Sequence, residues 1–427
     1  MSSEAFTGDV LGPVLSPEDV QPTLRRRIRL LRVLGPAFVA SVAFVDPGNF
    51  ATNIDGGSRF GYTLVWVVVA ASLIAMCIQA LSAKLGLATG RNLAEICRDE
   101  FSRPASIGLW LQAEAISVVT DLAEVVGAAV GLHLLTGLPL FPSALLVGVA
   151  TFAILSLDRF GFRTIELVIA AILAVIGVSY VIELFFAQPP LEIVARHIVV
   201  PSFAGTDSVL LAVGIVGATV MPHVIYLHSA LTQRRIVPKG RKEQRRLSRF
   251  THVDVVIAMS IAMLINVAML VMAASVFHDK GLGSAGSFAA AHATLKPALG
   301  SAAAALFALA LLAAGLSSSV VGTMSGQIVM QSFIRRRIPL VVRRLVTLVP
   351  ALVVIGIGAD PMHALVLSQV VLAFGIPFAA VPLILFTSRR DLMGCLVNRR
   401  STTALAVAIT AAVCLLNALL IVLKVAG

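Results

Sequence analysis

Two short stretches of this sequence combine possible metal-binding side chains with residues that break helices. The first reads Asp-Pro-Gly-Asn at 46–49 and the second reads Met-Pro-His at 221–223, each inside an apolar segment. Proline removes a backbone donor and clashes with the preceding turn, and glycine lets the chain leave helical geometry. Freed backbone or a carboxylate at membrane depth is tolerated only where protein buries it or it lines a cavity. We therefore expect two interrupted helices that form a binding site for a cation.

Four potential ligands lie at these two breaks. Asp46 offers a charged oxygen, Asn49 an amide oxygen, Ala218 a freed carbonyl oxygen, and Met221 a thioether sulfur. Mg²⁺ and Ca²⁺ prefer oxygen alone, whereas sulfur favours softer transition metals, so the mixed set indicates Mn²⁺ or Fe²⁺ and admits Cd²⁺. Methionine more often fills gaps in a core, however. From the residues alone, liganding and packing both remain open for Met221.

A row of acids in another apolar segment has the chemistry of a proton relay. Glu114, Asp121 and Glu124 are spaced by seven and three residues, which places them on one face of a helix. Acids inside a membrane must face protein or water, and such rows serve as proton relays. Arg343 and Arg344 begin a later segment and could pair with these acids. A purely structural ion network is the alternative, and the sequence leaves it open.

Two histidines extend this set of titratable groups. His223 adjoins the second break, and His228 follows about one and a half turns later. Histidine titrates near neutral pH unless its surroundings change that. We place both histidines, together with Asp46, in a predicted proton pathway with the acids and arginines.

The elements that must position these side chains are transmembrane helices. Of the 427 residues, 58% are hydrophobic and 13% are charged, and the mean hydropathy is +0.96, whereas a soluble chain is about a quarter charged. We therefore expect an all-α polytopic membrane protein. The net charge of +11 does not indicate nucleic-acid binding, because the basic residues lie between the apolar segments. Residues 1–22 lack the apolar core of a signal peptide, and the four cysteines form no metal or redox motif.

We predict eleven spans, of which the first and sixth are the broken ones. The positive-inside rule places the N-terminus in the cytoplasm and the C-terminus outside. Of the 33 Lys and Arg, only Arg59, Arg196, Lys280, Lys296 and Lys424 then fall on the outer side. The predicted spans are 33–58, 62–88, 104–134, 141–157, 164–186, 207–235, 250–276, 301–332, 338–358, 361–388 and 402–425.

Proline-interrupted segments at the same place in two halves of a chain are typical of inverted-repeat transporters. Either proline alone could merely kink a helix, but the possible ligands beside both favour true breaks. Five spans reverse orientation, so spans 1–5 and 6–10 would form the two repeats, and span 11 would be an addition. The predicted divisions are a disordered cytoplasmic segment with a basic run (1–32), the first repeat (33–186), an extracellular loop (187–206), the second repeat (207–388), and a cytoplasmic loop with span 11 (389–427).

The paired motifs at 46–49 and 221–223 resemble the signatures of the Nramp (natural resistance-associated macrophage protein) family of divalent metal transporters, and in particular its bacterial proton-dependent Mn/Fe type. The similarity extends from about Val33 to the last span. It implies a leucine-transporter-like 5+5 inverted repeat and proton-coupled uptake of Mn²⁺, Fe²⁺ and related ions. Relatives that carry Mg²⁺ or Al³⁺ depart from the pattern at the methionine or alanine position, and this chain keeps both residues.

The resemblance also implies roles for individual residues. It makes Asp46, Asn49, Met221 and the Ala218 carbonyl the metal ligands, and it brings Gln369 near the metal in inward-occluded forms. The residues that it assigns to the proton pathway are Asp121, Glu124, His223, Arg343 and Arg344.

We therefore expect proton-coupled import of divalent transition metals by alternating access. The protein would not be an enzyme and would hold no cofactor, because the metal and the proton are its substrates. The alternative is a sodium-coupled organic-solute symporter on the same fold, although Asp46 beside the break argues against an anionic substrate. An intramembrane metalloenzyme is a third possibility, but the chain has no HExxH motif, and Asp46, Asn49 and Met221 would activate water poorly.

The remaining expectations concern location and partners. The composition, rich in Ala and Arg, and the absence of glycosylation-type extracellular loops favour a bacterial cytoplasmic membrane. We expect a monomer, because no span shows a clear small-xxx-small face for dimerisation. The expected partners are divalent metal ions, protons and the lipid bilayer, without nucleic acid.

Overall fold

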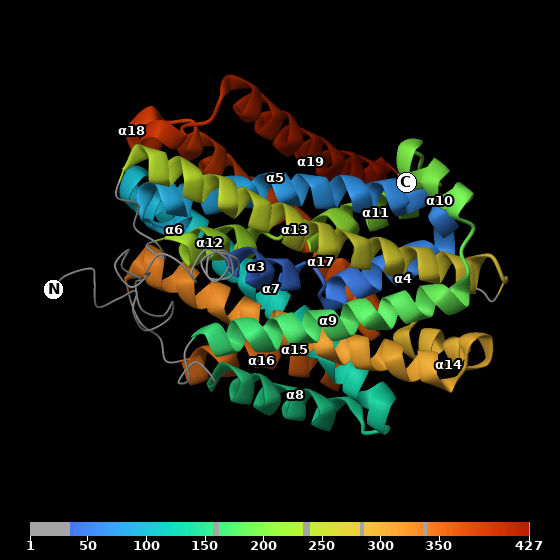
Figure 1. Ribbon diagram of the computed structural model, residues 1–427. Coiled ribbons are helices and arrows are strands. Elements are labelled where there is room, and N and C mark those ends of the chain that lie inside the picture. The colour runs from blue at the N-terminus through green and yellow to red at the C-terminus, as the bar shows by residue number, and fades with distance from the viewer. Residues whose placement is uncertain (1–34, 157–161, 234–239, 282–285, 336–339, 427) are drawn as a thin grey trace, which may run out of the picture.

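The computed structural model describes residues 35–156, 162–233, 240–281, 286–335 and 340–426. All regular structure in these ranges is helical, and Figure 1 shows the long helices side by side in one bundle. The unbroken long helices are α5 (Val65–Thr89), α7 (Arg103–Thr136), α8 (Leu140–Leu155), α9 (Phe162–Ala187), α13 (Arg241–Ala273), α15 (Ser301–Ile334), α16 (Leu340–Gly356), α17 (Pro361–Thr387) and α19 (Arg400–Ala426).

The first and sixth predicted spans are each divided into two helices. The first consists of α3 (Pro36–Ala43) and α4 (Pro47–Phe60), and the sixth of α11 (Thr206–Thr219) and α12 (Pro222–Thr232). In both, a proline occupies the first position of the second half, where its missing N–H costs nothing. The residue before each proline has an extended backbone, with ψ of 168° at Asp46 and 118° at Met221. The predicted breaks are confirmed, because a kinked but continuous helix would keep helical ψ angles there.

Each of the eleven predicted spans corresponds to one helix or one pair of half-helices. In the described ranges, eight helical stretches are long and apolar enough to cross a membrane, and Leu140–Leu155 and Leu345–Gly356 are shorter apolar helices. One boundary differs clearly, because α13 begins at Arg241 rather than at 250. The predicted segment 1–32 lies outside the described residues.

Several short helices between the spans were not predicted. They are α6 (Leu93–Glu100), α10 (Leu191–Val199) within the predicted loop 187–206, α14 (Phe288–Leu299) and α18 (Arg390–Met393). Together with turns, these elements cover the two ends of the bundle (Figure 1).

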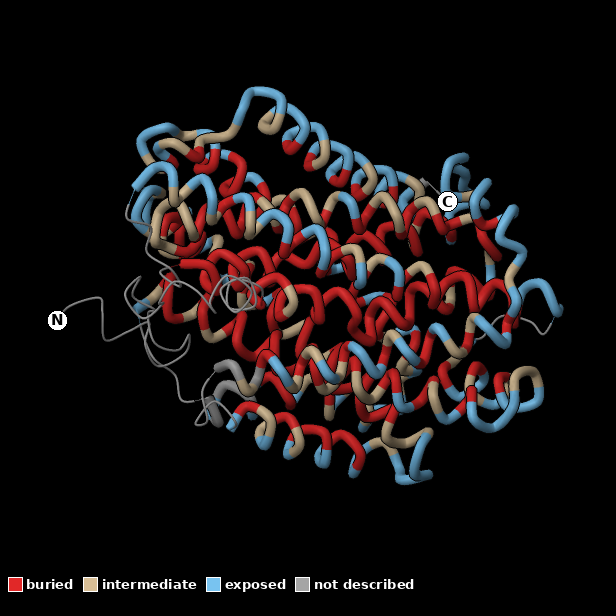
Figure 2. Tube along the Cα trace, viewed as in Figure 1, coloured by how far each residue is buried: buried red, intermediate tan, exposed pale blue. Residues whose placement is uncertain are grey.

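The two broken helices form the centre of the molecule. In α11 and α12, 94% of the most apolar window is buried inside the protein, against 28% in α19. Figure 2 shows buried residues concentrated in the interior and exposed ones on the outer helices α8 and α19. Large apolar side chains such as Phe185 and Val425 are exposed on the periphery, as expected for a surface that faces lipid.

The first half of the broken first span, α3, is capped by a residue from a distant part of the chain. Asp254 of α13 accepts hydrogen bonds through Oδ2 from the backbone N–H groups of Gly35 (3.4 Å) and Ala37 (3.2 Å). The first N–H groups of a helix have no partner within the helix, and a carboxylate there is also favoured by the helix dipole. Asp254 therefore holds the start of α3 against α13.

Candidate metal centre

The Asp46 carboxylate has one oxygen held by protein and one oxygen open. Asp46 is the N-cap of α4, and its Oδ1 accepts hydrogen bonds from the backbone N and the side-chain Nδ2 of Asn49, both at 2.8 Å. The residue is 1% exposed, and its Oδ2 has no hydrogen-bond partner among the described residues. A buried charged oxygen without a partner is costly unless a cation or a proton compensates it.

Hydrogen bonds join the two breaks at this carboxylate. Asn49 Nδ2 also donates to the Ala218 carbonyl oxygen at 2.9 Å, and Thr219 Oγ1 donates to Asn49 Oδ1 at 3.3 Å. Because α11 ends at Thr219, the Ala218 carbonyl is one of those that a helix leaves without an intrahelical partner. Asp46, Asn49 and Ala218, which were predicted from separate segments, therefore lie together.

Met221 occupies the position in the second break that Asp46 occupies in the first. It is the N-cap of α12, its side chain is 1% exposed, and it follows Ala218 by three residues. Its thioether cannot cap the helix, since it makes no side-chain hydrogen bond there. The break thus places a buried residue with a soft sulfur atom three positions after the carbonyl that Asn49 contacts.

Gln369 of α17 reaches both breaks because glycines make room for it. A Cβ atom on Gly48 would lie 2.2 Å from Gln369 Nε2, and a Cβ atom on Gly217 would lie 1.9 Å from the Gln369 carbonyl oxygen. Gln369 Nε2 donates to Ser368 Oγ at 3.0 Å, while its Oε1 has no hydrogen-bond partner in the described chain. The predicted residue therefore brings another open oxygen to the junction.

The donors at this junction are unlike those of a resident metal site. Among the described residues, no group of three or more His, Cys, Asp or Glu could hold a metal ion. The junction instead offers one carboxylate, two amides, a carbonyl and a thioether. One charged ligand gives weaker and more reversible binding than the several anionic ligands of high-affinity sites.

Two of the three predicted relay acids lie buried at one point of the bundle. Asp121 and Glu124 of α7 are each 1% exposed, whereas Glu114 is half-buried. A Cβ atom on Gly322 of α15 would lie 2.7 Å from Glu124 Oε2 and 3.1 Å from Asp121 Oδ1. α16, which contains positions 343 and 344, packs against α7, but the side chains of Arg343 and Arg344 lie outside the described part of the chain.

His223 connects the second break to the helix of the acids. Its Nδ1 lies 3.3 Å from Oγ1 of Thr120, the residue before Asp121. The Thr120 hydroxyl already donates to the Ile116 carbonyl at 3.0 Å, so His223 Nδ1 must be the donor, which leaves Nε2 as the acceptor in the neutral ring. His223 Nε2 is buried and has no hydrogen-bond partner among the described residues.

His228 has a different neighbour from His223. Its Nδ1 lies 2.9 Å from Gln79 Oε1 on α5, so the amide oxygen accepts and Nδ1 donates. Of the two predicted histidines, His223 therefore meets α7 and His228 meets α5.

A chain of amides that was not predicted as part of the site lies beside the first break. Asn266 of α13 donates to the carbonyl oxygen of Phe44 at 2.6 Å, and Asn53 Nδ2 donates to Asn266 Oδ1 at 3.1 Å. Asn266 thus satisfies a carbonyl that the break sets free. The isolated amide in the middle of an apolar span was the available signal, although such amides more often only join helices.

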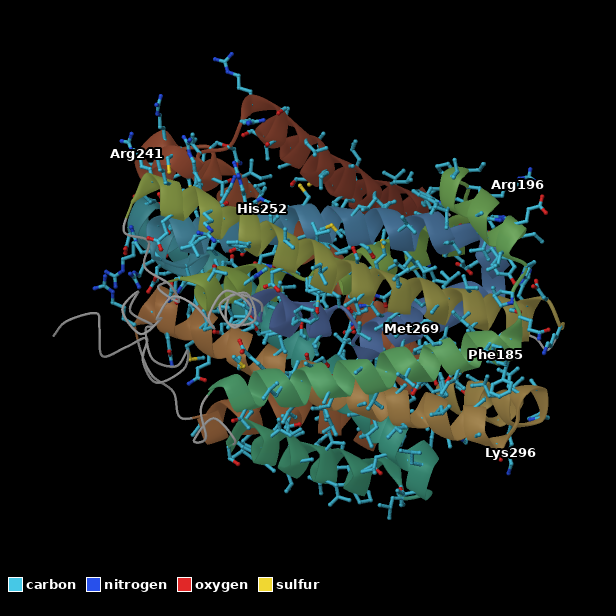
Figure 3. All side chains as sticks on the ribbon, viewed as in Figure 1. Phe185, Arg196, Arg241, His252, Met269 and Lys296 are labelled. Carbon is cyan, nitrogen blue, oxygen red and sulfur yellow. The ribbon has the colours of Figure 1, made fainter. Side chains whose placement is uncertain are left out.

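Polar contacts tie the helices together at both ends of the bundle. At one end Arg59 of α4 contacts Asp207 of α11 at 2.5 Å, and Tyr62 donates to Asp279 Oδ2 at 2.7 Å. At the other end Arg389 pairs with Glu100. Figure 3 labels Arg241 at this second end and Arg196 and Lys296 at the first. Because Asp46, Asn49, Met221 and Gln369 are at most 1% exposed, the junction is closed to solvent from both ends.

At this second end Asp99 of α6 forms ion pairs with three arginines, Arg91, Arg98 and Arg335. Partial burial alone would raise the pKa of Asp99, but a hydrogen bond from Arg98 and the charges of Arg98, Arg91 and Arg335 lower it below its ordinary value. The charged form of Asp99 is therefore favoured, and it holds α6 close to the end of α15.

Known proteins are similar to almost the whole chain. The family described as Nramp, natural resistance-associated macrophage protein-like, matches residues 37–423. The divalent metal cation transporter MntH of Deinococcus radiodurans is 54% identical over 393 residues, which cover 92% of this chain and 90% of that protein. MntH of Bacillus subtilis is 50% identical over 407 residues, covering 94% and 96%.

Solved structures agree with this similarity. The manganese transporter of Eremococcus coleocola, in complex with an aromatic bis-isothiourea substituted compound, is 34% identical and superimposes with a TM-score of 0.83 over 94% of this chain and 90% of that one. A nucleobase-cation-symport-1 family transporter is 18% identical with a TM-score of 0.59, over 92% and 90%. This second likeness concerns the fold alone, which is the leucine-transporter-like arrangement with broken first and sixth helices.

Proposed function

The chain belongs to the Nramp family, and from this premise we propose that it imports divalent transition-metal ions, Mn²⁺ or Fe²⁺ first, together with protons. The observation that carries the proposal is the open Oδ2 of Asp46 at the junction of the two breaks. Family membership over residues 37–423 disfavours the sodium-coupled organic-solute symporter, and nothing at the junction favours it.

We assign the metal ion to Asp46, Asn49, the Ala218 carbonyl and Met221, with Gln369 as an additional oxygen ligand. Asp46 supplies the charge that attracts a dehydrated dication, and the neutral oxygens complete the coordination. The Asn49 side chain already bridges Asp46 and Ala218 through Nδ2, so a modest rotation of this amide would turn its oxygen to the ion. Met221 would discriminate against Ca²⁺ and Mg²⁺, because sulfur replaces an oxygen that these ions prefer.

We assign proton movement to Asp46, His223 and the α7 acids. Asp46 can hold either the metal ion or a proton, so metal binding would release a proton toward His223, whose Nε2 is an open acceptor. Thr120 connects His223 to Asp121 and Glu124 along α7, and Glu114 continues toward the cytoplasmic end. Arg343, Arg344 and His228 complete the proposed pathway.

The proposed orientation follows the positive charges. The end with Arg241 and α6 would be cytoplasmic, and the end with α10 and α14 would be external, in a bacterial cytoplasmic membrane. The segments 33–186 and 207–388 would form the inverted repeats, with span 11 outside them. Alternating access would open the sealed junction first to one side and then to the other, by movement at the breaks of α3–α4 and α11–α12. No contact with a second copy is needed for this cycle, so we propose a monomer.

Uptake by purified protein in liposomes tests the proposed function. Mn²⁺ uptake should accelerate when the outside is more acidic than the lumen, a pH dye in the lumen should report proton entry, and sodium should have no effect. Mn²⁺ uptake that depends on sodium and ignores the pH gradient would overturn the proposal.

A further inference from the structure

The buried face of α9 carries a carboxyl group for which the proposed metal and proton sites have no use. Glu183 is 0% exposed, and neither of its carboxyl oxygens has a hydrogen-bond partner among the described residues. From Ile169 onward it belongs to a stripe with helical spacing whose other members are apolar or aromatic: Ile169, Leu173, Ile176, Tyr180 and Ala187. Glu166, also buried, precedes this stripe by one turn, toward the other end of α9. A carboxyl group at a core position of a span contributes no stability, so its presence indicates a function.

Charged groups from neighbouring helices do not compensate Glu183. α3, α13, α14 and α15 pack along α9, Phe50 of α4 touches Tyr180, and Ser275, just after α13, bonds to Ala187. The charged residues of α4 are Asp55 and Arg59, which pair with each other. α3 and α15 contain no ionisable side chain, and the charged residues of α13 end at Asp254, in its cytoplasmic half. α14 contributes the half-buried His292 and the exposed Lys296, and His278 follows α13 at the same end. In the described chain, none of these groups forms a hydrogen bond with Glu183.

Glu183 lies on the external side of the metal junction, near its aromatic boundary. Tyr180, one helical turn before it, packs edge-on against Phe50, with ring centroids 5.5 Å apart. Phe50 directly follows Asn49 and also meets Phe307 at 6.4 Å. One turn after Glu183, the Ala187 carbonyl accepts a hydrogen bond from Ser275 at 2.9 Å. Glu183 therefore lies between the external end of α9 and the aromatic residues beside the metal ligands.

An ionised Glu183 is incompatible with this closed arrangement. Burying a carboxylate with no cation or hydrogen-bond donor carries a large desolvation cost, and this cost is avoided when the group carries a proton. We propose that Glu183 is a proton-binding site on the external side, which takes up a proton from outside when the protein closes over the metal ion. The proposal rests on the function and orientation proposed above, and it adds a buried carboxyl on the external side, where α7 supplies the half-buried His133 and no acid.

The linkage between this proton and closure has a definite sign. Closure needs the neutral carboxyl, so external acid favours closure and rising external pH opposes it. Above the pKa that Glu183 has in the outward-open form, the equilibrium constant for closure should fall by up to about tenfold per pH unit. Glutamine has nearly the same shape and is neutral at every pH. Glu183→Gln should therefore close without taking up this proton.

The experiment measures Mn²⁺ uptake into liposomes against external pH, at a fixed pH in the lumen. In wild type, uptake should fall steeply from mildly acidic to neutral external pH. In Glu183→Gln the slope should be several-fold shallower, uptake at neutral external pH should exceed that of wild type, and fewer protons should enter per Mn²⁺. Glu183→Asp, which keeps the carboxyl, should retain the slope. Glu192→Gln is the matched control, because it removes an exposed carboxyl of α10 at the same end.

An unchanged slope in Glu183→Gln would overturn the inference while leaving proton-coupled metal import intact. If wild type itself shows no pH-dependent Mn²⁺ uptake, the proposed function fails instead. If Glu183→Gln does not fold, infrared difference spectra of wild type and Glu183→Asp decide. A protonated carboxyl band should appear on closure with Mn²⁺ and shift in the Asp variant, and its absence would overturn the inference.

Discussion

At the scale of single residues, Asp46 supplies the charge of the proposed metal site. It is the only charged member of the proposed ligand set, and its Oδ1 is already occupied by Asn49. In the proposed site the remaining oxygen, Oδ2, would therefore provide most of the attraction for a dication that has lost its water. Every other proposed ligand is a neutral dipole, which refines the geometry and the selectivity more than the affinity.

Asp46→Ala should abolish Mn²⁺ uptake without unfolding the protein. Removing one partner of a buried charge pair costs about 3–5 kcal/mol, so Mn²⁺ affinity should fall on the order of a hundredfold or more. Calorimetry of the purified variant gives affinity and fold together. Asp55→Ala is the control, because Asp55 lies on the same helix and pairs with Arg59. Substantial uptake by folded Asp46→Ala would contradict the site assignment.

Met221→Ala should change selectivity more than total transport. Water can fill the vacated position, and water suits Ca²⁺ and Mg²⁺ better than sulfur does. Mn²⁺ uptake should survive in part, Cd²⁺ uptake should fall further, and Ca²⁺ should begin to compete. The ratio of Mn²⁺ to Ca²⁺ transport is the quantity to measure, because it is insensitive to the amount of folded protein.

Met259→Ala provides the comparison for this ratio. Met259 is 2% exposed in α13, so its truncation should cost a similar loss of core packing, on the order of 2–5 kcal/mol. If both variants keep the wild-type ratio, Met221 is a packing residue and the metal filter lies elsewhere.

The helix breaks and the polar side chains beside them could be predicted from sequence, whereas the contacts of other polar residues could not. Asp46 and Met221 stand beside prolines inside apolar segments, and that conflict between residue type and environment is visible without a structure. Glu183 and Asn53 lack such a signal, because an isolated polar residue does not reveal which side of its helix is buried. What they contact depends on helices that are distant in sequence.

At the scale of helices, close contact between α11 and α17 sets the geometry of the junction. Gly217 allows the two backbones to approach so closely that no side-chain atom fits between them. At Gly127 on α7 the close neighbour is a side chain, because a Cβ atom there would lie 2.0 Å from Pro47 Cβ. The break in the first span thus rests directly on the helix that carries the acids. Sequence predicted the helices but not these contacts, because hydropathy does not specify which helices meet.

Gly217→Ala should lower both thermal stability and Mn²⁺ uptake. Its Cβ atom would lie 1.9 Å from a backbone oxygen that cannot move independently of α17, so α11 and α17 must separate. Gly148→Ala is the matched control on α8, where the nearest atom is a leucine methyl carbon at 3.6 Å. The free energy of unfolding of that variant should be unchanged or higher by up to about 1 kcal/mol. Equal melting temperatures for the two variants would contradict this packing argument.

The helix boundaries that sequence placed wrongly have identifiable causes. α13 begins as early as Arg241 because the Arg, Lys, Glu and Gln residues that precede its apolar part are good helix formers. α6 is too short for a hydropathy window, but its capping box between Asn92 and Glu95 could have been recognised in the sequence.

At the scale of the whole molecule, the charge distribution predicts which end meets the cytoplasm. The external assignment of α10 and α14 depends on this distribution and on the number of spans before them. Single cysteines in a chain without its four native ones test it. A membrane-impermeant thiol reagent on intact cells should label Lys280→Cys and not Arg241→Cys, both at exposed positions. The reverse pattern would invert the orientation and, with it, the direction of transport.

The cap that Asp254 provides for α3 has a consequence for biosynthesis. The two N–H groups that donate hydrogen bonds to Asp254 lie 219 and 217 positions earlier in the chain. The start of α3 therefore lacks this partner until the ribosome has made the intervening segment. At translation rates of about 5–20 residues per second, this interval lasts roughly ten to forty seconds. During that time α3, with only eight residues, is far too short to cross a bilayer alone. Its final placement therefore depends on the insertion of the seventh span, and a chain truncated before Asp254 would expose a defective first span to membrane quality control.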